Sequence, residues 1–119
     1  MALVPARVLV VEDDQDIREA VVEAITGRGY EVVEAENGAV ALDRMREHAP
    51  CIVLLDLMMP VMDGWEVVAQ MDTEPSLAAV PICIVSAHDR DLPRNVAVLR
   101  KPVSLASLLQ TVENYCGPP

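Results

Sequence analysis

Acidic side chains follow two apolar runs of this sequence. Glu12 and Asp13 come directly after residues 8–11, and Asp56 comes directly after residues 52–55. Ser86 ends a third apolar run, and Lys101 follows a fourth. Carboxylates gathered in one crevice repel each other, so each would have a raised pKa unless a cation joins them. A set of candidate ligands that offers only oxygen atoms, with no Cys or His, suits Mg²⁺. This ion takes one or two protein carboxylates and fills its other positions with water or phosphate oxygens.

The same residue types fit phosphoryl transfer to a carboxylate. A lysine beside an acidic cluster neutralises a carboxylate or holds a phosphoryl oxygen as a point charge, and a serine hydroxyl adds a neutral donor. A carboxylate next to Mg²⁺, a lysine and a hydroxyl is a setting for aspartyl-phosphate formation, because the cations offset the charge on the transferring group. We therefore expect Asp56 to be the phosphoryl acceptor, held at the end of a buried central strand.

The elements that must position these residues alternate along the chain. Apolar and β-branched runs predict strands, and apolar residues at helical spacing predict helices that begin near Asp14, Asn37, Asp63 and Ser104. Buried strands alternating with amphipathic helices indicate an α/β fold, a doubly wound five-stranded parallel sheet. Such sheets bind ligands at the carboxyl ends of their strands, where the candidate residues lie. The predicted strands are 7–12, 30–35, 52–55, 81–87 and 95–100.

The connection between the last two strands is too short for a full helical crossover. Residues 87–94 are "AHDRDLPR", eight mostly polar residues that include a proline. A helical crossover normally needs at least ~10–12 residues. As a helix these residues would cover only ~12 Å, whereas an extended path covers about 26 Å and the return past a five-residue strand takes roughly 16 Å. The sequence therefore predicts that the fourth helix is missing or reduced to one turn.

Composition and charge exclude several classes of protein. The chain has 119 residues, 52% of them apolar, which predicts one domain with an aliphatic core, because there is no Phe and only one Trp. The formal charge of −10 disfavours nucleic acid and anionic membranes as partners. No apolar run approaches the ~20 residues of a membrane span, and residues 1–14 turn acidic too soon for a signal peptide. We expect a cytoplasmic protein.

The three cysteines predict no disulfide and no metal site. Cys51, Cys83 and Cys116 are odd in number and have no CxxC or Cys/His spacing. All three lie in or beside predicted strands or the last helix. We interpret them as small buried thiols in a reducing compartment.

Over nearly its whole length the sequence resembles the receiver domains of two-component response regulators. The matching motifs are "VLVVEDD" (8–14), "LLDLMMPVMDG" (54–64), "IVSA" (84–87) and "RKP" (100–102). The resemblance implies a flavodoxin-like sheet of order 2-1-3-4-5 and a single receiver domain over residues 1–119, with its core at about 6–116. It implies that Glu12 and Asp13 bind Mg²⁺ together with Asp56 and the backbone carbonyl of Met58. Asp14 matches a capping residue more than a metal ligand.

The resemblance also implies the partners and the remaining site residues. Asp56 would take phosphate from a phosphohistidine on a sensor histidine kinase or a phosphotransfer protein, with no enzymatic activity beyond its own Mg²⁺-dependent phosphorylation and dephosphorylation. Ser86 and Lys101 would contact the phosphoryl oxygens, and a cis Lys101–Pro102 bond fits the pattern. His88, two residues after Ser86, lies where the family tunes its rate of dephosphorylation.

Two departures from the family concern the output. Val98 stands where the family usually has an aromatic residue that turns inward on activation, and the family's fourth helix has no sequence to form it. The uncovered strip beside the last two strands would then contact a second copy or another protein. An alternative reading is therefore a receiver-like interaction module that does not switch by phosphorylation.

Two other classes fit less well. A phosphatase with an aspartyl nucleophile requires a second acidic residue two positions after the first, and this chain has Met58 there. A flavin- or nucleotide-binding fold requires glycines and free backbone N–H groups after the first strand to bind phosphates, and this chain has acidic residues there.

Overall fold

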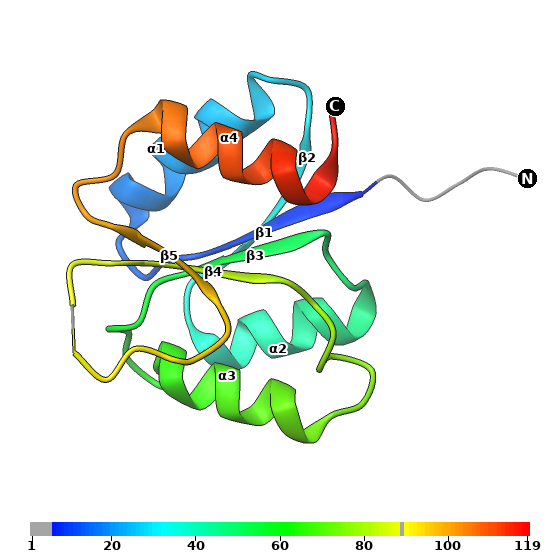
Figure 1. Ribbon diagram of the computed structural model, residues 1–119, viewed down its shortest axis with the longest axis vertical. Helices are drawn as coiled ribbons and strands as arrows, with labels where there is room; N and C mark the ends of the chain where they lie inside the picture. Colours follow the sequence, from blue (N-terminus) through cyan, green and yellow to red (C-terminus); the bar gives the residue numbers. More distant parts are fainter. Residues whose placement is uncertain (1–5, 89) are drawn as a thin grey trace, which may run out of the picture.

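The computed structural model describes residues 6–88 and 90–119 as a three-layer α/β structure (Figure 1). Its five strands are parallel, as the sequence pattern predicted, and they have the order β2-β1-β3-β4-β5 that the family resemblance implied. In chain order the elements are β1 (Arg7–Val11), α1 (Gln15–Thr26), β2 (Glu31–Ala35), α2 (Gly38–Glu47), β3 (Ile52–Leu55), α3 (Gly64–Thr73), β4 (Ile82–Ser86), β5 (Ala97–Arg100) and α4 (Leu105–Cys116).

Two apolar clusters hold the layers together, one on each face of the sheet. Alternate residues of a strand point to opposite faces, so Leu9 and Val11 of β1 pack with the α2 and α3 layer while Val8 and Val10 pack with the α1 and α4 layer. Every residue of β3 is buried, which follows from its place in the middle of the sheet. Figure 1 shows α1 and α4 on one side of the sheet and α2 and α3 on the other.

Each helix begins at a polar side chain that accepts a hydrogen bond from its first turn. The N-cap residues are Asp14, Asn37, Asp63 and Ser104, where the sequence predicted the helices to begin. Asp63 and Glu66 form a reciprocal capping box. None of the helices in the described part of the chain has the length and apolar character that a membrane crossing requires.

The connection from β4 to β5 contains residues 87–96. No helix is present among residues 87–88 and 90–96, and Asp89 lies outside the described residues. Asp91 and Asn95 adopt left-handed backbone conformations, with φ of 53° and 61°. The prediction that a family helix is missing or shortened here stays a prediction, because it compares this chain with its relatives.

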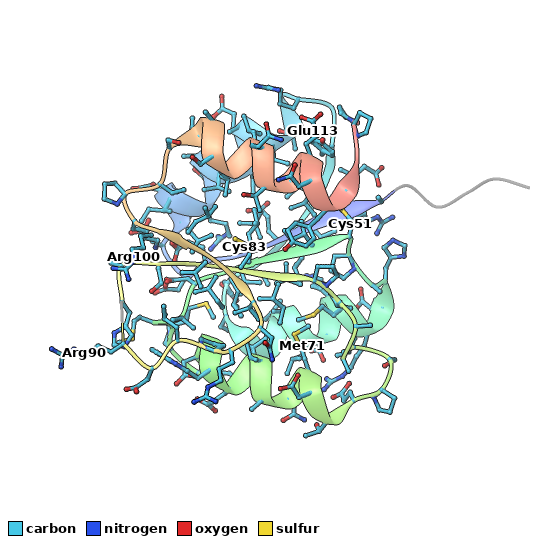
Figure 2. The ribbon with its side chains drawn as sticks, in the orientation of Figure 1. Cys51, Met71, Cys83, Arg90, Arg100 and Glu113 are labelled. Atoms are coloured by element: carbon cyan, nitrogen blue, oxygen red, sulfur yellow. A yellow bond between two sulfur atoms is a disulfide. The ribbon has the colours of Figure 1, made fainter. Side chains whose placement is uncertain are left out.

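The interpretation of all three cysteines as thiols is wrong. Cys51 and Cys116 form a disulfide although 65 residues separate them (Figure 2). The start of β3 and the end of α4 lie at the same edge of the sheet, so the two Cα atoms are 5.3 Å apart. Spacing rules such as CxxC detect only local pairs and miss a bridge made by the fold. Cys83 alone is a buried thiol, and burial raises its pKa to about 11.

Candidate functional site

The polar strand ends meet at the carboxyl edge of the sheet. Glu12 follows β1, Asp56 follows β3, and Ser86 is the last residue of β4. These are the three buried polar side chains of the described chain, with 5%, 8% and 1% of their surface exposed. Asp56 continues the pairing of the central strands, since its backbone N–H donates to the carbonyl of Val11 at 3.1 Å. The buried strand therefore fixes the position of its terminal carboxylate.

Glu12, Asp13 and Asp56 form one carboxylate cluster. Each offers an oxygen atom, and these three atoms lie within 4.8 Å of one another. This donor set fits Mg²⁺, which prefers hard oxygen ligands and leaves positions for water or phosphate oxygens. Partial desolvation, a hydrogen bond with Glu12 and repulsion from Glu12 and Asp14 raise the pKa of Asp13. A divalent cation would relieve that repulsion.

Lys101 supplies positive charge to the same cluster, and it is the only lysine in the chain. Its Nζ lies 2.8 Å from Glu12 Oε1 and 3.7 Å from Asp56 Oδ2. Desolvation lowers the pKa of this ammonium, but the hydrogen bond to Glu12 and the attraction of Asp56 and Glu12 outweigh it and raise the pKa. Lys101 is joined to Ser86 through the backbone, N to O at 3.1 Å, and its bond to Pro102 is cis, as the resemblance suggested.

The loop after Asp56 turns back closely over the site. The backbone N–H of Gly64 donates to the carbonyl of Leu57 at 2.8 Å. A Cβ at Gly64 would lie 2.6 Å from the carbonyl oxygen of Asp56, so the close approach requires a glycine. Val61 has φ of 69° and is 80% exposed, an unfavourable backbone for a β-branched residue. Met58 lies in this loop, and metal binding by its carbonyl stays a prediction.

A contact that the sequence does not reveal connects Ser86 with α3. The backbone N–H of His88 donates to Ser86 Oγ at 3.1 Å. The His88 ring meets Trp65 edge to face, with 5.0 Å between ring centroids. Trp65 Nε1 also donates to the carbonyl of Asp91. Residues 65, 88 and 91 have no sequence signal that would pair them, because the conformation of the β4–β5 connection brings residues 88 and 91 against Trp65 of α3.

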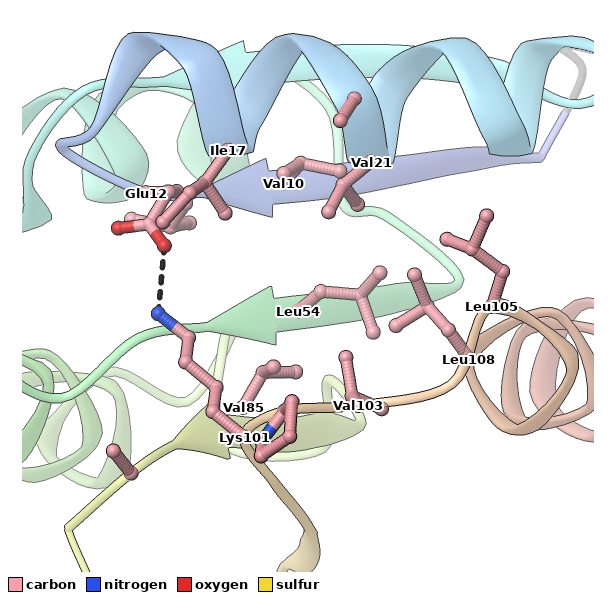
Figure 3. Close-up of a pocket in the computed structure, with 14 residues that line it drawn as sticks. Val10, Glu12, Ile17, Val21, Leu54, Val85, Lys101, Val103, Leu105 and Leu108 are labelled. Atoms are coloured by element: carbon pink, nitrogen blue, oxygen red, sulfur yellow. Dashed lines mark hydrogen bonds and ion pairs between the residues drawn. The ribbon is translucent and has the colours of Figure 1, made fainter.

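An apolar groove lies beside the site, between α1 and α4. Its volume is about 560 Å³, and Glu12 and Lys101 line one end of it (Figure 3). Ile17 of α1 and Leu105 of α4 line the groove and expose 42% and 53% of their surface. The sequence indicated the two amphipathic helices but not that their exposed apolar residues would share one groove.

Comparisons with known proteins agree with this geometry. The family model described as the response regulator receiver domain matches residues 8–113. The chain is 37% identical over 112 residues to the response regulator receiver protein CpdR of Brucella abortus, covering 90% of this chain and 93% of that protein. It is 31% identical to the polar-differentiation response regulator DivK of Brucella anthropi, covering 95% and 98%.

Solved structures give the same result. The Vibrio cholerae chemotaxis protein CheY4 superposes with a TM-score of 0.83 at 27% identity, over 94% of this chain and 99% of that one. The family model covers most of the sequence, including all the strand ends described above. The chain therefore belongs to the response regulator receiver domain family.

Proposed function

We propose that the chain is a phosphoacceptor that receives a phosphoryl group on Asp56 and passes this signal to a partner. The observation that supports it is the arrangement around the buried Asp56 carboxylate. Lys101 Nζ lies 3.7 Å from Asp56 Oδ2 and 2.8 Å from Glu12 Oε1, and Asp13 completes the acidic cluster. One ammonium and three carboxylates leave net negative charge, which favours a divalent cation.

The proposed reaction moves a phosphoryl group between two nucleophiles. A carboxylate oxygen of Asp56 attacks the phosphorus of a phosphohistidine, the P–N bond breaks, and the histidine leaves with its electron pair. Lys101 stabilises the charge on the phosphoryl oxygens, and the Ser86 hydroxyl, whose oxygen accepts from His88 N–H, donates its own proton to one of them. Mg²⁺, when bound by Glu12, Asp13 and Asp56, adds positive charge at those oxygens. We propose no enzymatic activity beyond this self-modification.

The test is the intact mass of the protein after incubation with acetyl phosphate. A phosphoryl adduct is expected on the wild type in Mg²⁺ and is expected to be absent after chelation and from Asp56→Asn. Asp63→Asn serves as the matched control, because this partly buried capping residue lies in the same loop and outside the cluster. An adduct that persists on Asp56→Asn would contradict the assignment.

We further propose that the phosphohistidine donor contacts the groove between α1 and α4. The groove opens next to Glu12 and Lys101, and the exposed Ile17 and Leu105 offer apolar contacts to a helical donor. Ile17→Asp is expected to slow transfer from a phosphorylated histidine phosphotransfer domain but not from acetyl phosphate. Tyr115→Asp, an exposed apolar position at the other end of α4, is the control. Equal loss with both donors would contradict a docking role.

A second candidate is an interaction module that does not switch. Val98 in place of an aromatic residue and the non-helical residues of the β4–β5 connection favour it. Ile82, Val96 and Val98 are only partly buried there, and we propose that a second copy or another protein covers them. Absence of any Asp56 adduct with both donors would favour this candidate. Monomeric sedimentation over a wide concentration range would count against self-association.

A further inference from the structure

Cys51 and Cys116 differ from Cys83 in accessibility. Both disulfide-bonded residues are partly exposed, whereas Cys83 is 0% exposed. Thiol–disulfide exchange needs a thiolate that can reach the bond in solution. Cys51 and Cys116 are therefore the cysteines that a thiolate in solution can approach, and the buried Cys83 is shielded from competing with them.

The bridge joins the sheet to the last turn of a helix. Cys51 is fixed to β1, because its backbone N–H donates to the carbonyl of Arg7 at 2.9 Å. Cys116 is the last residue of α4, and the following Gly117 accepts a hydrogen bond from the Tyr30 hydroxyl at 2.7 Å. The end of α4 is thus held by one covalent bond and one long-range hydrogen bond.

The surroundings also suit the reduced form. Cys51 Sγ lies 3.3 Å from the carbonyl oxygen of Arg7, so a thiol there has an acceptor for its S–H. The Tyr30 hydrogen bond would remain as one contact to the end of α4 after the covalent bond is broken, although it holds that end less firmly than the covalent bond does. In the reduced form, the Cys51 thiol therefore has an acceptor in the Arg7 carbonyl, and Tyr30 keeps its hydrogen bond to Gly117.

We propose that Cys51 and Cys116 are a reversible redox site that fastens the end of α4 to the start of β3. The oxidant is a low-molecular-weight disulfide such as oxidised glutathione. One protein thiolate attacks it to form a mixed disulfide and release one thiol. The second protein thiolate then displaces the other thiol, so the protein dithiol loses two protons and two electrons and the small disulfide is reduced to two thiols. The inference does not depend on phosphorylation.

The first test counts accessible thiols on the folded protein. After equilibration with reduced and oxidised glutathione at different ratios, the native protein is alkylated with iodoacetamide and its intact mass is measured. We expect no adduct in the oxidised form, two in the reduced form, and the same change in Cys83→Ala. Failure of glutathione to change the count between zero and two would overturn the proposal.

The second test measures what the bridge does to α4. The bridge closes a loop of 65 residues and so restricts the unfolded chain. We therefore expect reduction to lower the Tm of the wild type by about 10 °C. Cys51→Ser with Cys116→Ser should have the lower Tm under both conditions, and Cys83→Ala should respond as the wild type does. Hydrogen exchange should increase at the end of α4 more than in α3. A Tm that is insensitive to reduction, or faster exchange spread equally over all helices, would overturn the proposal.

Discussion

The two ends of β3 are held in different ways, although only four strand residues separate them. At the carboxyl end, three carboxylates and one ammonium lie together, so like charges are kept close by the rigid strands. At the amino end, Cys51 is bonded to α4, and Tyr30 donates to Gly117 nearby. At the carboxyl end the carboxylates repel each other, and a bound cation would relieve that repulsion. At the amino end the disulfide and the Tyr30 hydrogen bond hold α4 in place. Substitutions at the first end should therefore change chemistry most, and those at the second should change stability most.

The largest expected effect is on phosphorylation of Asp56 in Lys101→Met. Removing the ammonium 3.7 Å from Asp56 Oδ2 takes away charge that stabilises the transferring group. We expect the rate with acetyl phosphate in saturating Mg²⁺ to fall about 100-fold or more. Lys101→Arg keeps the charge with a different shape and should recover part of the rate. An unchanged rate in Lys101→Met, measured by intact mass over time, would contradict the role.

Gly64→Ala tests whether the carboxyl end depends on a close backbone approach. The new Cβ would meet the Asp56 carbonyl oxygen at 2.6 Å and the Leu57 Cα at 2.8 Å. We expect unfolding in urea to show a loss of about 2 kcal/mol, together with slower phosphorylation. Gly27→Ala at the end of α1 has helical φ and its nearest contact at 3.1 Å, so it should change the free energy of unfolding much less. Equal effects of the two variants would count against the close approach.

Alkaline pH should weaken both ends of β3. The pKa of Lys101 is raised by Glu12 and Asp56 against desolvation, and the pKa of Tyr30 is raised by desolvation and by Glu113. A raised folded-state pKa gives stability that is complete below the unfolded value and is lost as pH rises through the folded value. The free energy of unfolding should therefore fall from about pH 10 upward. Lys101→Met and Tyr30→Phe should each remove part of this fall, and a fall that is identical in both variants and the wild type would exclude these groups as its cause.

The smallest expected effect is a gain of stability in the loop after Asp56. Val61 has φ of 69° and is 80% exposed, so Val61→Asn relieves an unfavourable backbone without removing buried contacts. We expect the free energy of unfolding to rise by about 1 kcal/mol. Val61→Ile keeps the β-branched side chain and should leave it unchanged. A loss of stability in Val61→Asn would show that the valine side chain contributes contacts that outweigh the strain.

The sequence predicted the features that follow from strand ends and helix starts. Asp56, Glu12 and Lys101 could be brought together because parallel strands present their carboxyl ends at one edge, and Asp14 and Ser104 are recognisable N-caps. The Cys51–Cys116 bridge was missed because nothing in a 65-residue separation indicates proximity. The Trp65–His88 contact and the left-handed Val61 were missed because both depend on loop conformation, which periodicity does not encode.

Because the chain has a single lysine, the reactivity of the Lys101 amine can be used to follow changes in the carboxylate cluster. Apart from the α-amino group, the chain offers one primary amine, and that amine is paired with Glu12 at 2.8 Å. Reagents that acylate neutral amines should react slowly while Lys101 is paired with Glu12, because the pairing favours the protonated ammonium over the reactive neutral amine. Any event that draws Glu12 toward a cation, or Lys101 toward a phosphoryl group, would change this rate. Acylation at Lys101, distinguished from acylation of the N-terminus by peptide mapping, would therefore follow the state of the carboxyl edge without a substituted residue as a probe.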